Sequence, residues 1–294
     1  MTHKESFLKY MRFERNSSEH TLEAYERDLD QFEQFMLESV EDFVLIEATT
    51  KQIRSWVVFL VSSDYEPRSV RRKVSSLKSF YRYMRKLQVI ERAPTDRVPL
   101  PKVGKRLPRF VDVDAMNHLL ADDYFPKDFE GVRDFVAVSM LYDAGMRVSE
   151  LVGLKDSDVR QAENVVRVLG KRRKVRNIPY PPVLNAAIDV YLAAREEKFG
   201  ENVPSFLLSN SGKQTYRKLI YNIVNKYLSL VTTLEQKSPH VLRHSYATHM
   251  MNNGADLNDV KELLGHSSLA ATQIYTHTTT EQLQKLYKQA HPRG

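Results

Sequence analysis

The chain has 294 residues, of which 42% are hydrophobic and 28% charged, a balance that is typical of an ordinary globular protein. It contains no cysteine, which excludes disulfides, thiolate nucleophiles and thiolate zinc sites, and the absence of any run of about 18 apolar residues argues against a membrane span. A net charge of +7 favours a polyanionic partner, and the lack of an apolar leader favours a cytoplasmic protein.

The first hundred residues predict helices only. Apolar residues recur at three- and four-residue steps in four segments, and Ser18, Thr50 and Pro67 stand at the starts of the last three. The fourth segment ends near Leu87, and its surface outside the apolar stripe is almost wholly basic. Because like charges destabilise a helix unless an anion offsets them, we expect this segment to contact a DNA backbone.

A basic, proline-rich segment at residues 93–109 has no helical period and predicts an extended, fairly stiff linker. It separates a helical core-binding domain, 1–92, from a second domain, 110–294. Two domains joined in this way are suited to embrace a duplex as a clamp. The candidate DNA-contacting residues on the fourth helix and the linker are Arg68, Arg71, Arg72, Lys78, Arg82, Lys102, Lys105 and Arg106.

The second domain is predicted to be mostly helical with one small β-hairpin. Two β-prone runs, 165–169 and 175–178, flank a basic tip that contains Lys171. Gly145 is expected to end a helix, and a new helix begins near Val148. The other expected helices cover 112–120, 129–144, 182–198, 215–230, 239–252, 256–264, 268–276 and 281–289.

Two short motifs near the C-terminal end suggest phosphodiester chemistry. His240 and Arg243 lie three residues apart behind a helix-starting proline, so they share one helix face. An arginine can hold two non-bridging phosphate oxygens, while a histidine shares or moves a proton. His266 follows a helix-ending glycine, and Tyr275 lies on a short polar segment after it. With no cysteine in the chain, Tyr275 is the candidate nucleophile.

Arg147 and Lys171 complete the candidate site. Arg147 stands at a break between two helices, with Glu150 three residues later and able to hold its guanidinium. A metal-free attack on a phosphodiester needs charge neutralisation, a nucleophile and a proton donor for the leaving oxygen. Arg147 and Arg243 suit the first requirement. Lys171, at the tip of the hairpin, suits the last.

Five boxes in this order and spacing resemble the signature of the tyrosine recombinase, or phage integrase, family. The match looks closest to the bacterial XerC/XerD site-specific recombinases, and it extends over nearly the whole chain. The resemblance implies a four-helix, SAM-like front domain and a mostly helical catalytic domain. The boxes are GMRVSEL, the lysine of VLGKRRK, HVLRH, LLGHSS and TQIYTH.

The resemblance also implies a mechanism similar to that of topoisomerase IB. Tyr275 would form a 3′-phosphotyrosyl link and free a 5′-hydroxyl, which Lys171 would protonate as it leaves. Arg147 and Arg243 would bind the phosphoryl oxygens, and His240 and His266 would assist. No cofactor, metal or ATP is implied, in line with the absence of a phosphate loop.

Members of the group act as tetramers on two DNA sites, often together with a paralogous recombinase. The resemblance thus implies a nucleoid-associated, cytoplasmic enzyme that resolves chromosome dimers at cell division, with a septal DNA translocase as a candidate partner. A tail helix at about 281–290 resembles the segment that docks on a neighbouring subunit, although it is equally compatible with packing on its own core.

Several alternatives stay open at the level of sequence. The family's hairpin lysine is commonly followed by glycine, whereas Lys171 is followed by arginine, so Lys174 is a second candidate for the general acid. An integrase of a mobile element would share all the chemistry. A non-catalytic DNA-binding protein would need only the basic helix, and a metallohydrolase would use His240 and His244. The histidines without an expected catalytic role, interpreted as structural or DNA-facing, are His244, His249 and His277.

Overall fold

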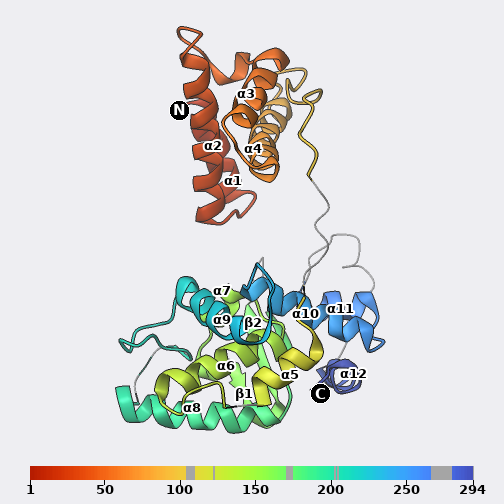
Figure 1. The fold of residues 1–294 in the computed structure, drawn as a ribbon. Coiled ribbons are helices and arrows are strands. Elements are labelled where there is room, and N and C mark those ends of the chain that lie inside the picture. The colour runs from red at the N-terminus through yellow and green to blue at the C-terminus, as the bar shows by residue number, and fades with distance from the viewer. Residues whose placement is uncertain are drawn as a thin grey trace. The chain divides into compact units, whose positions relative to one another are not determined.

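The computed structural model describes residues 1–103, 110–121, 123–169, 175–201, 203, 205–265 and 280–293, with backbone alone at 280–283. Over these residues the chain is mostly helical and has one small antiparallel sheet, which confirms the expected mainly α fold (Figure 1). It divides into a first unit, Met1–Arg106, and a second unit, Leu107–Gly294. No helix among the described residues is both long and apolar enough to cross a membrane.

The described part of the first unit has four α-helices, of which the first three start at a side-chain cap and the fourth at Pro67. Ser18 accepts a hydrogen bond from the backbone of Thr21, as its position before the second helix predicts. The third helix is capped by Thr49, which forms a capping box with Gln52; the expected cap, Thr50, is the first helical residue instead. The helices are α1 (His3–Phe13), α2 (Glu19–Leu37), α3 (Thr50–Ser62) and α4 (Pro67–Lys86), with a 3-10 turn, η1 (Leu45–Glu47).

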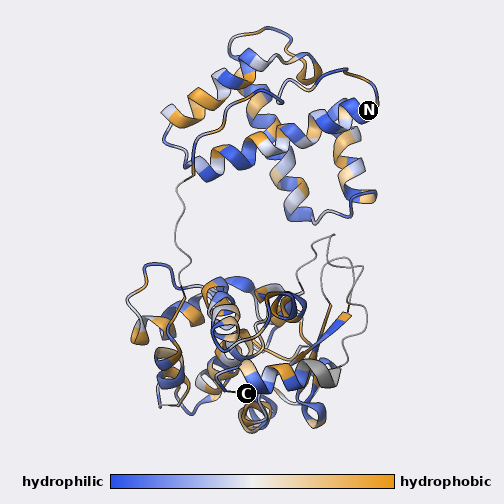
Figure 2. Cartoon of the chain, turned by 90° about the vertical axis from the view of Figure 1, so that its right-hand side faces the viewer, coloured by the Kyte–Doolittle hydropathy of each residue, from blue (hydrophilic) through white to orange (hydrophobic). Residues whose placement is uncertain are grey.

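Aromatic side chains fill the core of the first unit. Phe7 packs edge-on against Phe80 at 5.6 Å between ring centroids, and Phe32 lies 5.1 Å from Trp56. All four are fully buried. Figure 2 shows polar and apolar residues on different faces of these helices, so the core forms where the apolar faces meet.

The second unit is built around α6, which is buried along almost its whole length because α8, α9 and α10 pack against it. Gly145 ends this region with φ +56°, a conformation that favours glycine, so its expected role as a stop is confirmed. The helices are α5 (Val113–Ala121), α6 (Phe129–Asp143), α7 (Val148–Val152), α8 (Val183–Phe199), α9 (Arg217–Val231), α10 (Pro239–Asn252), α11 (Leu257–Leu264) and α12 (Thr280–Ala290), with 3-10 turns η2 (Asp156–Asp158) and η3 (Gln161–Glu163).

The predicted hairpin is present as two antiparallel strands, β2 (Val165–Leu169) and β3 (Val175–Pro179). Their register pairs Leu169 with Val175, so the five residues of the tip, 170–174, lie between paired strand ends and outside the described residues. A third strand, β1 (Val159–Arg160), pairs with β2 on its other edge. It is too short to show the alternation by which strands are predicted.

The tail helix α12 packs on its own unit in this single chain. Tyr287 is buried in a small core with residues of α10 and α11, and its ring stacks on that of His291 at 4.6 Å. Beyond the helix, Arg293 donates a 2.9 Å hydrogen bond to the fully buried carboxylate of Asp143. Burial raises the pKa of Asp143 to about 7, against the lowering effect of Arg293.

We expect Arg293→Gln to loosen the tail more at pH 8 than at pH 5. Removing Arg293 raises the pKa of Asp143 further. A carboxyl whose pKa is higher in the folded state than in the unfolded state, where it is about 4, destabilises the folded state as the pH rises from the lower pKa to the higher one. At pH 5 both proteins hold Asp143 protonated. By pH 8 we expect the variant to have lost about tenfold more protection against exchange than the wild type.

Hydrogen–deuterium exchange of residues 284–293, corrected for the intrinsic rate at each pH, measures this difference. Lys288→Gln is the matched control because it removes one positive charge from an exposed position of the same tail. Equal loss of protection at both pH values would show that Arg293 does not act through Asp143.

Candidate functional site

Arg147 is held in place by Glu150, as the spacing of the two residues predicts. It lies at the N-cap of α7, where its backbone N–H and its Nη1 donate to the two carboxylate oxygens of Glu150, both at 2.8 Å. Its Nη2 donates to the backbone carbonyl of Gly265 at 2.9 Å. Its side chain remains 32% exposed, so a guanidinium fixed from two directions still faces solvent.

Arg243 lies on α10 and is largely buried. Its Nη1 donates to the carbonyl of Gly145 at 2.5 Å, and its Nη2 donates to the carbonyl of Leu264. Burial and, secondarily, the nearby charge of Arg147 lower its pKa to about 10, so it stays charged at neutral pH. A guanidinium has five N–H donors, and the described residues account for two of those of Arg243.

The two arginines meet at the C-terminal end of α11. They bind the carbonyls of consecutive residues, Leu264 and Gly265, where the helix leaves its carbonyl groups without partners and carries a partial negative charge. The structure therefore brings together two sequence-predicted residues that are 96 positions apart. The evidence is that each donates a hydrogen bond to one of two adjacent carbonyls.

Of the remaining predicted catalytic residues, His240 is among the described residues and the others are not. His240 is exposed on the first turn of α10, three residues before Arg243. Lys171 and its alternative Lys174 fall in 170–174, and His266, Tyr275 and His277 fall in 266–279, so all five lie outside the described residues. The chain on either side is described. Gly265, whose carbonyl binds Arg147, directly precedes the segment that carries His266 and Tyr275.

Arg176 belongs to the same cluster and was missed by sequence reasoning. Its Nη1 and Nη2 donate to Glu150 at 2.9 and 3.0 Å, and its Nε donates to the carbonyl of Leu263 at 3.2 Å. In the sequence it follows a run of four basic residues and does not stand out from them. A signal was present, since Arg176 shares a strand face with the buried Ile178, and a charge on a buried face requires a partner.

The hydrogen bonds to Glu150 explain its charge state. Burial by itself raises the pKa of this carboxyl, but the hydrogen bonds and charge of Arg176, together with the hydrogen bonds of Arg147, outweigh burial and lower it. Glu150 is therefore ionised at neutral pH, and its charge is shared between two guanidinium groups.

Two of the three histidines without an expected catalytic role, His244 and His249, are among the described residues. His249 is buried, and its Nδ1 is 2.9 Å from the hydroxyl of Tyr142, which agrees with a structural role. His244 is half-buried on α10. Within the described residues, no three His, Asp or Glu side chains are grouped closely enough to hold a metal ion.

A basic stripe runs along the outer face of α4. We define it as Arg68, Arg71, Lys78 and Arg82, which are exposed except for the half-buried Lys78. Among the described residues, no carboxylate forms an ion pair with any of them. Lys102, beyond α4, is exposed, whereas Lys105 and Arg106 lie outside the described residues.

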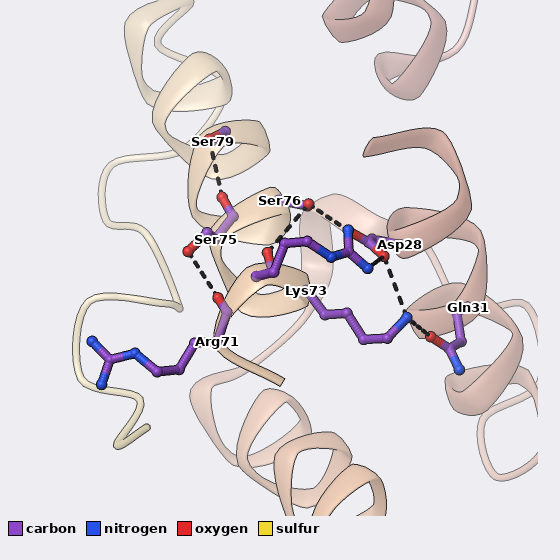
Figure 3. A network of polar contacts seen from close by, with 8 residues as sticks. Asp28, Gln31, Arg71, Lys73, Ser75, Ser76 and Ser79 are labelled. Carbon is purple, nitrogen blue, oxygen red and sulfur yellow. Dashed lines mark hydrogen bonds and ion pairs between the residues drawn. The ribbon is translucent and has the colours of Figure 1, made fainter. Parts of the chain in front are cut away.

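Arg72, also a predicted DNA contact, points instead to a buried carboxylate. Its two terminal nitrogens bind both oxygens of Asp28, which is fully buried on α2. Lys73 and Ser76 also donate to Asp28, at 3.3 and 2.7 Å (Figure 3). Figure 3 shows Arg71, one residue earlier, pointing away from this network.

We expect the double variant Lys78→Ala/Arg82→Ala to weaken DNA binding in a salt-dependent way. Each lost phosphate contact removes about 0.9 from the slope of log affinity against log salt, so the slope should fall by about 2. Fluorescence anisotropy of labelled duplex DNA over a salt series measures it. An unchanged slope would exclude the basic stripe from the DNA interface.

Arg72→Ala is the matched comparison and should give the opposite pattern. It leaves Asp28 with fewer donors, which should cost about 1–2 kcal/mol of unfolding free energy, while the salt slope stays near that of the wild type. Trp56 is the single tryptophan of the chain and is buried in the first unit, so its fluorescence during urea denaturation reports on this unit.

Comparison with known proteins assigns the chain to a family. The phage integrase family model matches residues 109–282, and the phage integrase N-terminal SAM-like domain matches residues 5–88. A tyrosine recombinase XerC of Chlorobaculum parvum is 35% identical over 315 residues, which cover 98% of this chain and 94% of that relative. XerC of Myxococcus xanthus is 37% identical over 296 residues, which cover 99% and 97%.

Solved structures with the same fold include recombinases bound to DNA. The Tn1549 transposon integrase in complex with transposon right-end DNA matches with a TM-score of 0.70 and 18% identity, covering 98% of this chain and 99% of that one. XerH bound to its difH substrate before cleavage matches with a TM-score of 0.66 and 18% identity, covering 96% and 83%. These structures share the fold, and the family models and the XerC relatives confirm the resemblance seen in the sequence motifs. The chain therefore belongs to the phage integrase family of tyrosine recombinases.

Proposed function

We propose that this recombinase cuts and rejoins DNA at a specific site through a covalent link to Tyr275. The observation that supports the proposal most directly is the meeting of Arg147 and Arg243 on the carbonyls at the end of α11. Two fixed guanidinium groups, each with more N–H donors than the described residues use, suit the equatorial oxygens of a phosphodiester under attack. The chain that leaves this point carries His266 and Tyr275.

The proposed reaction is a pair of transesterifications. The phenol oxygen of Tyr275 attacks phosphorus, a phosphotyrosyl bond forms at the 3′ end, and the bond to the 5′ oxygen breaks. Lys171, with Lys174 as the alternative, gives a proton to that oxygen, while His240 and His266 assist proton transfer and phosphate contact. A 5′-hydroxyl of the partner strand then attacks and releases Tyr275. One phosphoester replaces another at each step, so neither ATP nor a metal is required.

In this proposal residues 1–92 form the core-binding domain and residues 110–294 the catalytic domain, joined by the linker 93–109 so that the two embrace the duplex. The basic stripe of α4, with Lys102, Lys105 and Arg106, contacts the DNA backbone. Arg72 has a structural role because its guanidinium binds the buried Asp28.

The biological role that we propose is resolution of chromosome dimers in the cytoplasm, on the nucleoid. It is supported by full-length relatives that carry the name XerC. The enzyme would act as a tetramer on two DNA sites, with itself or a paralogous recombinase as the partner and a septal DNA translocase as a further candidate partner.

Covalent trapping on genomic DNA tests the proposal. The protein is incubated with nicked genomic DNA in excess EDTA, the mixture is denatured in SDS, and protein-linked DNA is recovered and sequenced. We expect protein on 3′ ends, unphosphorylated 5′ ends and one recurrent sequence near the replication terminus. Recurrence at the ends of a mobile element would indicate an integrase instead. Activity lost in EDTA and restored by zinc would contradict the mechanism.

A further inference from the structure

Three consecutive carbonyls at the end of α11 each accept a hydrogen bond from a different arginine. The carbonyl of Leu263 accepts from Arg176, that of Leu264 from Arg243 and that of Gly265 from Arg147. The proposed function employs the latter two arginines. Arg176 is 14% exposed and comes from β3, directly after the hairpin tip.

Arg176 also supports Glu150, and through it Arg147. The two oxygens of Glu150 accept four hydrogen bonds, two from Arg147 and two from Arg176. Glu150 is 4% exposed, so water contributes little to stabilising its charge. Without Arg176, Arg147 would be the one remaining partner of the carboxylate among the described residues and would neutralise it alone.

Arg176 contributes to the net positive charge of the cluster. Three arginines and one glutamate leave the cluster with a net charge of +2. Loss of Arg176 would reduce this to +1, next to a phosphorus centre that gains negative charge during attack. Gly265 is part of the same arrangement, because a Cβ at that position would lie 2.9 Å from Nη1 of Arg176.

We propose that Arg176 is a positioning residue for strand cleavage. It keeps the charge of Glu150 from cancelling that of Arg147, and it ties β3 and α7 to the end of α11 from which the segment with Tyr275 departs. The inference rests on the proposed roles of Arg147 and Tyr275. It predicts that Arg176 affects the rate of the chemical step and not the affinity for DNA.

The test is single-turnover formation of the covalent complex on a nicked suicide substrate, measured over a range of protein concentrations. For Arg176→Gln we expect the plateau rate to fall by about 10- to 100-fold, with the half-saturating concentration unchanged within about twofold. Arg176→Lys, which keeps the charge without the two-pronged contact, should give an intermediate rate and covers the case in which the glutamine variant does not fold. Arg167→Gln is the matched control, since Arg167 is exposed on the neighbouring strand β2.

A double-mutant cycle with Glu150→Gln separates positioning from a general structural effect. If Arg176 acts through Glu150, Arg176→Gln should lower the rate by less than about threefold in the Glu150→Gln background. Equal losses in both backgrounds, or a wild-type rate in Arg176→Gln, would overturn the inference. So would a loss confined to the half-saturating concentration.

A substrate with sulfur at the leaving 5′ position tests the alternative route for Arg176, through the hairpin lysine. A thiolate leaves without the proton that an alkoxide needs. We expect Arg176→Gln to remain slow on this substrate, and full rescue would move its action from Arg147 to the hairpin. A covalent complex that survives Tyr275→Phe would instead overturn the proposed function, and this inference with it.

Discussion

Replacement of Tyr275 with phenylalanine is expected to abolish covalent attachment to DNA while leaving DNA affinity unchanged. The variant keeps the ring and loses the single oxygen that would bond to phosphorus. The chain has no cysteine to substitute for it. Loss of a nucleophile costs many orders of magnitude in related transfer reactions, so the rate of covalent complex formation should fall by at least about 10⁴-fold.

The measurement is an SDS-stable band between the protein and an end-labelled suicide substrate, followed over time. Tyr216→Phe is the control because Tyr216 is exposed at the start of α9 and contributes the same chemical change. Anisotropy on the intact site provides the affinity. A persistent covalent band in Tyr275→Phe would assign the nucleophile to another residue and leave the DNA-binding part of the proposal in place.

Arg243→Lys should give the second largest effect, about 10²- to 10³-fold in the cleavage rate. The lysine keeps the positive charge, but one ammonium group cannot hold the carbonyls of Gly145 and Leu264 and also face the phosphate with a planar pair of donors. In the proposed mechanism the arginine therefore has two tasks, to join the segment after α6 to α10 and α11 and to stabilise negative charge. Both depend on its fork of donors.

Stability must be measured beside the rate, because a buried carbonyl without a donor costs about 1–3 kcal/mol. We expect part of the loss of cleavage rate to be structural, visible as a lower midpoint of urea denaturation followed by circular dichroism. Most of the loss should remain when the DNA substrate is saturated with folded protein. Arg217→Lys, at an exposed position on α9, is the control. A cleavage rate within threefold of the wild type would show that Arg243 does not contact the reacting phosphate.

The helices and the hairpin were predictable because their signals are local. Pro239 and the apolar spacing marked α10 at the bounds that the structure gives it, and β2 and β3 flank the basic tip as expected. The error at the start of α3 has a local cause as well. Two adjacent threonines, Thr49 and Thr50, are both good N-caps, and the glutamine three residues after the first selects Thr49.

Residue type, order and spacing were enough to predict the family and the mainly helical fold. They also singled out Arg147 and Arg243, which the structure brings together at the end of α11. Only the three-dimensional packing shows which partner each arginine binds. Arg71 and Arg72 are adjacent and chemically identical, yet Arg72 binds the buried Asp28 and Arg71 points away from it. Likewise, Arg176 joins the arginine cluster because β3 packs beside α7 and α11. A guanidinium's role depends on the carboxylates and carbonyls that packing brings to it, and these come from distant parts of the chain.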